Sequence, residues 1–259
     1  MALVPDYARR LCQETNVCMP AGLKTGAACD LALYHEAGAK GRGVLVVTTI
    51  CSLSFKSGRS SSTGATLVWT QPEKTAFMSS MCSLVRQVWS DKHRIRTSST
   101  VPAVTDVGML FDLRVSENLS VFSHSHWNLE VVKTDAWKSS SVGGSGGNFL
   151  LNGSGDFDSG DINPALKAPG VTQRAAVHEF GHMMGLRDEY LDAKGRPEDN
   201  PHWTADIHSV MNSGEQVRDR HYTMFAYWVT KQFGTLARLA RQSIEFKVNG
   251  TLAMADAKL

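Results

Sequence analysis

The 259-residue sequence has no long hydrophobic run. No stretch approaches the roughly 18 uninterrupted apolar residues that read as a membrane-spanning helix. The first eleven residues contain Asp6, Arg9 and Arg10 and lack the apolar core of a secretory signal peptide. We therefore expect a chain without a transmembrane segment or classical signal, made in the cytoplasm.

The sequence also has no excess of charge of one sign. It contains 27 Lys and Arg against 25 Asp and Glu, for a net charge of +2, and its basic residues lie in short clusters such as residues 93–96. Nucleic-acid-binding domains concentrate basic residues on one face or along one helix. We therefore expect neither a nucleic acid nor a membrane surface as a partner.

Cysteine is scarce, and its spacing fits no zinc module. The sequence has five cysteines, without a C-x-x-C pair. Cytosolic thiols rarely pair, so we expect free thiols, and a disulfide among the first three only if the protein matures outside the cytoplasm. The five are Cys12, Cys18, Cys29, Cys51 and Cys82.

What the sequence does contain is an ordinary globular composition, 42% hydrophobic and 20% charged. Residues 1–42 show only a faint helical pattern at residues 31–39 and are interpreted as an N-terminal extension. Residues 43–235 form the main domain. Residues 236–259 are predicted to form a C-terminal β-hairpin, because alternating apolar residues flank Asn249-Gly250.

The main domain is predicted to be α+β. Residues 43–55 are apolar and β-branched, which is typical of a buried strand, and residues 107–115 and 127–131 alternate with period two. An amphipathic helix of roughly 18 residues is expected from Pro72, and a closing helix over residues 217–233.

One segment carries the chemistry: residues 177–190 read VHEFGHMMGLRDEY. His178 and His182 are four residues apart, so on a helix both imidazoles lie on one face and can reach one metal ion. Zinc accepts histidine nitrogen in tetrahedral geometry. Glu179 then points beside the metal, where it can act as the general base for a metal-activated water.

A catalytic zinc site needs a third protein ligand and an open fourth position. Gly185 tolerates the left-handed conformation that ends a helix, so the chain can reverse and bring Asp188 under the ion. Glu189 and Glu215 are alternatives if the turn differs.

The motif resembles the H-E-x-x-H-x-x-G-x-x-H/D signature of metzincin zinc peptidases, in its aspartate variant. Residues 208–213, HSVMNS, look like the Met-turn of that clan, with Met211 as the floor beneath the metal. The resemblance implies that residues 43–235 are a metzincin-like catalytic domain with a twisted mixed sheet, an active-site helix and a C-terminal helix. It also implies a substrate-binding edge strand, expected at residues 148–152.

The sequence departs from that pattern at Ser213, where several metzincins have a tyrosine that assists the transition state. The candidates for that role are Tyr190, His221 and Tyr222.

Two weaker patterns also suggest metal ligands. Asp156, Asp158 and Asp161 surround Gly160 and could hold calcium, although an ordinary acidic turn has the same composition. His124 and His126 alternate at a predicted strand end and could form a second metal site.

The sequence thus predicts a zinc-dependent endopeptidase that acts on proteins or peptides. The alternatives are a zinc amidase acting on a cell-wall or other non-peptide amide, and a catalytically silent binding module. By analogy alone, a small metallopeptidase domain without a signal resembles the toxic cargo of bacterial secretion and injection systems. Its partners would then include delivery machinery and an inhibitor protein, with export by a route that needs no classical signal.

Overall fold

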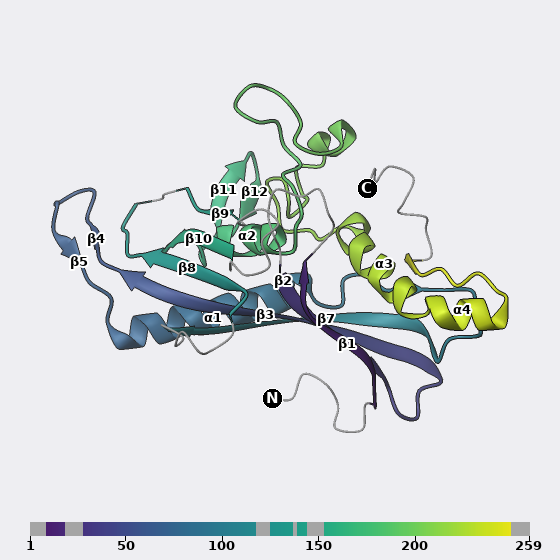
Figure 1. The fold of residues 1–259 in the computed structure, drawn as a ribbon. Coiled ribbons are helices and arrows are strands. Elements are labelled where there is room, and N and C mark those ends of the chain that lie inside the picture. The colour runs from purple at the N-terminus through teal and green to yellow at the C-terminus, as the bar shows by residue number, and fades with distance from the viewer. Residues whose placement is uncertain (1–8, 19–27, 118–124, 137–138, 144–152, 250–259) are drawn as a thin grey trace.

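The fold is built on one mixed sheet that curls into a half-barrel (Figure 1). The structure, a computed structural model, describes residues 9–18, 28–117, 125–136, 139–143 and 153–249. The sheet follows the order β13-β6-β7-β3-β8-β10-β9, with β2 added to β3 and β1 added to β2. Its strands are β1 (Arg9–Cys18), β2 (Ala28–His35), β3 (Gly41–Lys56), β6 (Ile95–Arg96), β7 (Val104–Glu117), β8 (Trp127–Val132), β9 (Ser141–Gly143), β10 (Gly153–Asp158) and β13 (Lys247–Val248).

The long strand β3 organises this sheet. One edge pairs in parallel with β7, while the other pairs first with β2, antiparallel over residues 43–48, and then with β8, parallel over residues 51–56. His126 lies where the partner changes: its Nδ1 accepts from Ile50 N at 2.9 Å, and its Nε2 lies 3.2 Å from Asp30 Oδ1. At this junction the Ile50 N–H lies between the β2 and β8 pairings, and the His126 side chain accepts the hydrogen bond that a strand partner would otherwise accept.

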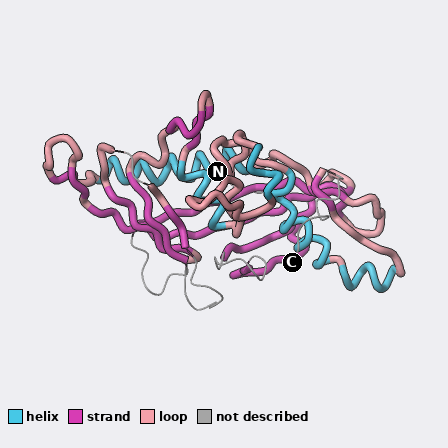
Figure 2. Tube along the Cα trace, turned by 90° about the horizontal axis from the view of Figure 1, so that it is seen from above, coloured by secondary structure: helices cyan, strands magenta, loops and turns pink. Residues whose placement is uncertain are grey.

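Within the described residues, four α-helices and several short elements surround the sheet. The helices are α1 (Gln71–Trp89), α2 (Ala175–Met183), α3 (Thr223–Gln232) and α4 (Gly234–Ala240), with 3₁₀ turns η1 (Pro201–Ala205) and η2 (Asp219–Tyr222). Two small ribbons, β4 (Gly58–Arg59) with β5 (Thr66–Leu67) and β11 (Ala165–Ala168) with β12 (Val171–Gln173), project from the body. The β4–β5 ribbon and α4 lie at opposite ends of the molecule in both views (Figures 1 and 2).

The core brings α1, α2 and the sheet together. Phe77, Met81 and Val85 form the buried stripe of α1, as the helical spacing predicts. At its end, Trp89 is fully buried against Phe180 of α2, at 5.8 Å between ring centroids, and its indole donates to the Val177 carbonyl at 3.0 Å. This packing fixes α2 against the strands.

Most predicted elements of the main domain are confirmed, including the strands over residues 43–55, 107–115 and 127–131 and the helix that begins near Pro72. The α+β class is confirmed as well. Residues 31–39 differ from the expectation: the chain is in β2 up to His35, because Leu31 and Leu33 alternate into the core. The described part of the expected N-terminal extension therefore joins the main sheet.

The closing helix begins later than predicted. Residues 219–222 form the 3₁₀ turn η2, α3 runs from Thr223 to Gln232, and α4 follows it. Near the C-terminus, β13 pairs with β6. The second strand of the predicted hairpin, like the edge strand expected at residues 148–152, lies outside the described residues. In the described portion of the chain, no helix is long and apolar enough to cross a bilayer.

Candidate metal centre

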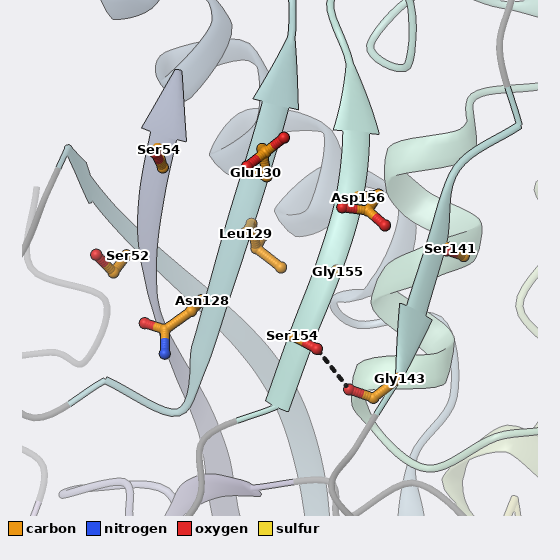
Figure 3. A pocket seen from close by; sticks show the side chains of 10 residues that line it. All are labelled: Ser52, Ser54, Asn128, Leu129, Glu130, Ser141, Gly143, Ser154, Gly155 and Asp156. Carbon is orange, nitrogen blue, oxygen red and sulfur yellow. Dashed lines mark hydrogen bonds between the residues drawn. The ribbon is translucent and has the colours of Figure 1, made fainter. Parts of the chain in front are cut away.

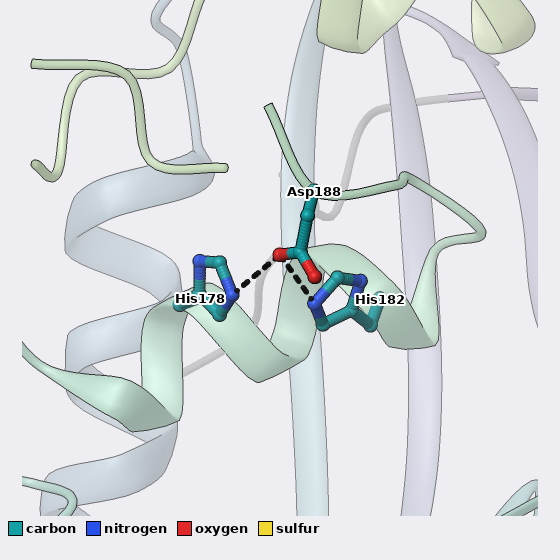
Figure 4. A group of neighbouring side chains, drawn as sticks. All are labelled: His178, His182 and Asp188. Carbon is teal, nitrogen blue, oxygen red and sulfur yellow. Dashed lines mark ion pairs between the residues drawn. The ribbon is translucent and has the colours of Figure 1, made fainter. Parts of the chain in front are cut away.

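Helix α2 carries the two histidines and ends in a turn that returns the chain to them. The helix packs through Val177, Phe180 and Met183, which are fully buried, so its opposite face presents His178 and His182. Gly185 has φ of +85°, the left-handed conformation predicted for it, and Leu186 N donates to Gly181 O at 3.1 Å. The chain reverses there and brings Asp188 back over the helix (Figure 4).

Three ligand-type atoms converge at this point. Asp188 Oδ1 lies 3.1 Å from His178 Nε2 and 3.2 Å from His182 Nε2. The three residues form the one group of three or more potential metal ligands found within the described residues, and their atoms lie within 4.8 Å of one another (Figure 4). Asp188 Oδ1 is buried and accepts no hydrogen bond of normal geometry, as expected of an atom oriented toward a cation.

Both imidazoles are held by their other nitrogen. His178 Nδ1 lies 2.8 Å from the Val210 carbonyl, and His182 Nδ1 lies 2.9 Å from the Leu186 carbonyl. A carbonyl can only accept, so each Nδ1 must carry the proton, and each Nε2 presents its lone pair to the convergence point. This is the usual outer-shell arrangement of metal-binding histidines.

The electrostatics of the group also favour a cation. Burial alone would lower the pKa of His182, but the adjacent Asp188 carboxylate, together with the charge of Glu179, outweighs burial and raises that pKa to about 9. Burial would raise the pKa of Asp188, yet the two histidines hold it well below its usual range. A bound metal ion would take the place of the protons that these contacts attract.

Glu179 lies beside the group, in a cavity of about 200 Å³ that also contains His178 and Tyr190. Its side chain is buried, and its Oε2 has no hydrogen-bond partner. Burial raises the pKa of Glu179, with the two histidines and the Val142 backbone N–H acting in the opposite direction. The cavity therefore presents a carboxylate oxygen with unused accepting capacity next to the three ligand atoms.

The alternative third ligands face elsewhere. Glu189 receives Arg220 Nε and Nη2, each at 2.6 Å, and lies 3.0 Å from His221 Nε2. Glu215 accepts from the backbone N and Nη1 of Arg174 at 2.8 and 2.7 Å. Asp188 is therefore the carboxylate that the turn brings to the histidines.

Met211 lies directly against α2, as its resemblance to a Met-turn residue implies. It is fully buried, and a Cβ added at Gly181 would lie only 2.1 Å from its Sδ. Gly181, the fourth residue of the HEFGH motif, therefore permits this close approach. The loop is joined to the segment after Asp188 through Glu189 N, which donates to Met211 O at 2.8 Å.

The three candidates for a transition-state helper have different surroundings. Tyr190 lines the cavity with its ring stacked on that of His178, at a centroid distance of 6.2 Å. His221 is buried, with Nδ1 accepting from Arg218 N and Nε2 facing Glu189. The Tyr222 hydroxyl is also buried and donates to the Trp89 carbonyl. Only Tyr190 of the three is within reach of the candidate site.

The three aspartates predicted as calcium ligands do not converge. Asp156 is exposed in β10, whereas Asp158 and Asp161 are buried and engaged in the turn that follows. Asp158 Oδ1 accepts from Gly160 N at 2.6 Å, and Asp161 Oδ2 accepts from Asp158 N and from Ser140 Oγ. The structure favours the acidic-turn interpretation. Of the two histidines predicted as a second metal site, His126 accepts a hydrogen bond from Ile50 N of β3, and His124 lies outside the described residues.

A larger hollow of about 610 Å³ lies on the sheet face beside β9 (Figure 3). Its lining is mostly polar and contains none of the metal-site residues. Ser141 and Gly143 of β9 line this hollow, while Ser139 and Ser140 line the smaller cavity. Consecutive residues of the segment 139–143 therefore line both hollows. The free thiols Cys12, Cys51 and Cys82 belong to neither lining.

Sequence reasoning missed the residues that support the site. Gln173, Arg174 and Arg220 contact the loop around Met211 or the segment beside Asp188. None belongs to a motif, because the partners in these contacts lie 31 to 41 residues away in the chain and most of them are backbone atoms. A polar residue directly before the motif helix was the one local signal for Gln173.

Comparison with protein-family models, with curated proteins and with solved structures gave no match for this chain. The functional conclusion therefore rests on the chemistry and geometry of the site.

Proposed function

We propose that this protein is a zinc-dependent endopeptidase, with His178, His182 and Asp188 as metal ligands and Glu179 as general base. The observation that carries the proposal is the coincidence of two features in one cavity. Three ligand atoms lie within 4.8 Å of one another, and a buried oxygen of Glu179 beside them has no partner. A structural metal site has no need of such a base.

The donor set fits zinc. Two imidazole nitrogens and one carboxylate oxygen are the ligand types of catalytic zinc sites, which keep the fourth position open. Calcium and magnesium prefer oxygen ligands throughout. Both Nδ1 atoms are already committed to carbonyls, which leaves the Nε2 atoms for the ion.

Zinc, when bound, acidifies water and polarises a carbonyl oxygen. Glu179 takes the water proton on its unpartnered Oε2 and returns it to the amine that leaves. Tyr190, which also lines the cavity, supplies the hydroxyl that the clan often places at the position of Ser213 here. The surrounding buried side chains limit the access of bulk water to this exchange.

A peptide substrate would extend the sheet at β9, the last strand of the described order. Val142 N–H faces Glu179 instead of β10, so the outer edge of β9 runs alongside the base. An extended peptide pairing with this edge would pass its carbonyls close to the metal. This edge favours an endopeptidase over an amidase with a closed pocket.

The decisive experiment combines metal analysis with one isosteric variant. The purified chain should bind about one equivalent of zinc and cleave casein. Glu179→Gln should keep zinc and lose cleavage by at least about 100-fold, because the amide cannot take a proton. Glu130→Gln, at a half-exposed carboxylate in the other hollow, is the matched control and should remain active.

Asp188→Ala should lose zinc, whereas Glu215→Gln should keep it. Cleavage retained by Glu179→Gln would show that Glu179 is not the base. Zinc binding without cleavage of casein would instead favour the amidase or the silent binding module.

A further inference from the structure

Gln173 occupies a buried position between the metal helix and the loop of Met211. It is the last residue of β12, separated from helix α2 by Arg174 alone, and only 3% of its surface is exposed. Its Nε2 donates to three backbone carbonyls, those of Val210 and Asn212 at 3.0 Å and that of Gly214 at 2.8 Å. One side chain therefore gathers alternate carbonyls of the loop.

The chemistry of these partners demands a hydrogen-bond donor, and the amide of Gln173 supplies one without adding a charge. Three carbonyl oxygens can only accept, so the group facing them must donate. The two protons of a carboxamide satisfy this requirement if one of them is shared. A carboxylate would be repelled, and an aliphatic side chain would leave buried carbonyls without a partner. The loop has no regular secondary structure over residues 210–214 to supply these bonds instead.

One of the three carbonyls also orients a metal ligand. The Val210 oxygen that Gln173 contacts is the same atom that accepts the Nδ1 proton of His178, at 2.8 Å. The next residue, Arg174, adds a second connection to the same loop through Glu215. Met211, between Val210 and Asn212, is thereby held against Gly181.

We propose that Gln173 is a positioning residue of the metal centre, which holds the Val210 carbonyl and the Met211 loop and so orients His178. This inference rests on the proposed metal site. Gln173 itself ligates nothing. It acts through its three carbonyl partners and through its Nε2, which lies 3.4 Å from His178 Nδ1. Its loss should weaken zinc binding more than it weakens the fold.

The test is the zinc affinity of Gln173→Leu, measured by competition with a chromophoric chelator on the full chain. Loss of an outer-shell partner typically weakens metal binding by about 10- to 100-fold, and we expect that range here. Thr230→Val is the matched control. It removes a hydroxyl that accepts from Phe246 N at 2.9 Å and contacts no metal-site residue, so its zinc affinity should stay within about twofold of the wild type.

Both variants are compared at a temperature where circular dichroism shows the metal-free proteins folded. An unchanged affinity in Gln173→Leu, or an equal loss in Thr230→Val, overturns the proposal. If Gln173→Leu does not fold, Gln173→Asn decides: it keeps an amide but is one methylene too short to reach all three carbonyls, and unchanged affinity refutes the inference.

Zinc affinity also separates this inference from the proposed activity. A wild-type protein that binds zinc but cleaves no casein refutes the peptidase activity. The role of Gln173 is then decided by the measured zinc affinities of the variants alone. A wild-type protein that binds no zinc refutes the metal centre itself.

Discussion

Substitution of Arg220 by methionine should destabilise the protein strongly, because it leaves a buried carboxylate without its partner. Glu189 is 3% exposed and receives two parallel hydrogen bonds of 2.6 Å from Arg220. Arg220 also donates to Asp206 at 2.9 Å, but Asp206 keeps a second partner in Arg218. Glu189 would retain only its contacts with His221 and Ser209.

The size of the effect follows from this burial. Breaking a buried ion pair on one side costs about 3–5 kcal/mol, since the remaining charge is neither solvated nor paired. A protein of this kind is stable by about 5–15 kcal/mol, so Arg220→Met should lose a large part of its free energy of unfolding. Methionine keeps most of the aliphatic length, so the loss comes from the guanidinium group, including its contact with the Trp203 ring at 5.0 Å from the ring centroid.

Urea unfolding of the metal-free protein, followed by tryptophan fluorescence, measures this free energy. The double variant Glu189→Gln/Arg220→Met should recover about half of the loss or more, because no unpaired charge remains. Arg196→Met is the matched control: Arg196 is 67% exposed in its pair with Asp192, and its loss should cost less than about 1 kcal/mol.

The reasoning is refuted if Arg220→Met costs less than about 1 kcal/mol, or if the double variant is no more stable than the single one. Either result would mean that Glu189 is solvated or protonated in the native state.

Two further predictions concern the buried carboxyl of Asp161 and the hydroxyl of Tyr190. Burial raises the pKa of Asp161 to about 7, so the folded carboxyl holds its proton to higher pH than the unfolded one, and the native state loses stability as pH rises from about 4 to about 7. The variant Asp161→Asn removes this pH dependence. In urea titrations, its free energy of unfolding relative to that of the wild type should therefore rise by about 2–3 kcal/mol between pH 5 and pH 8. A difference between the two proteins that does not change with pH would contradict this prediction. Tyr190→Phe should lower kcat on casein by about 10- to 100-fold with little change in KM, if its hydroxyl acts in the transition state. Tyr222→Phe, whose hydroxyl bonds Trp89 O, should keep kcat and lose about 1 kcal/mol of stability, and equal kcat values in the two variants would exclude the role of Tyr190.

The sequence by itself determined the local features of the site. Helical spacing places His178 and His182 on one face, and Gly185 adopts the left-handed turn that its position after the motif predicts. The strands and the first helix of the main domain were also readable, because their periodicity directly reflects which side chains are buried.

Only the tertiary structure decided between chemically equivalent residues. Asp188, Glu189 and Glu215 are all carboxylates near the motif, and the difference between them is the distant arginine that pairs with each glutamate. Tyr190 and Tyr222 likewise differ only in where the fold places their hydroxyls.

Long-range partners also explain what the sequence did not reveal. Residues 28–35 contain a short alternation at Leu31 and Leu33, but the edge of β3 with which they pair is not visible in the local sequence. Gln173 gains its role from carbonyls 37 to 41 residues away, and a backbone carbonyl has the same identity in every residue. Local periodicity therefore specifies the two proposed histidine ligands, whereas the residues that support them depend on contacts that form only when the chain has folded.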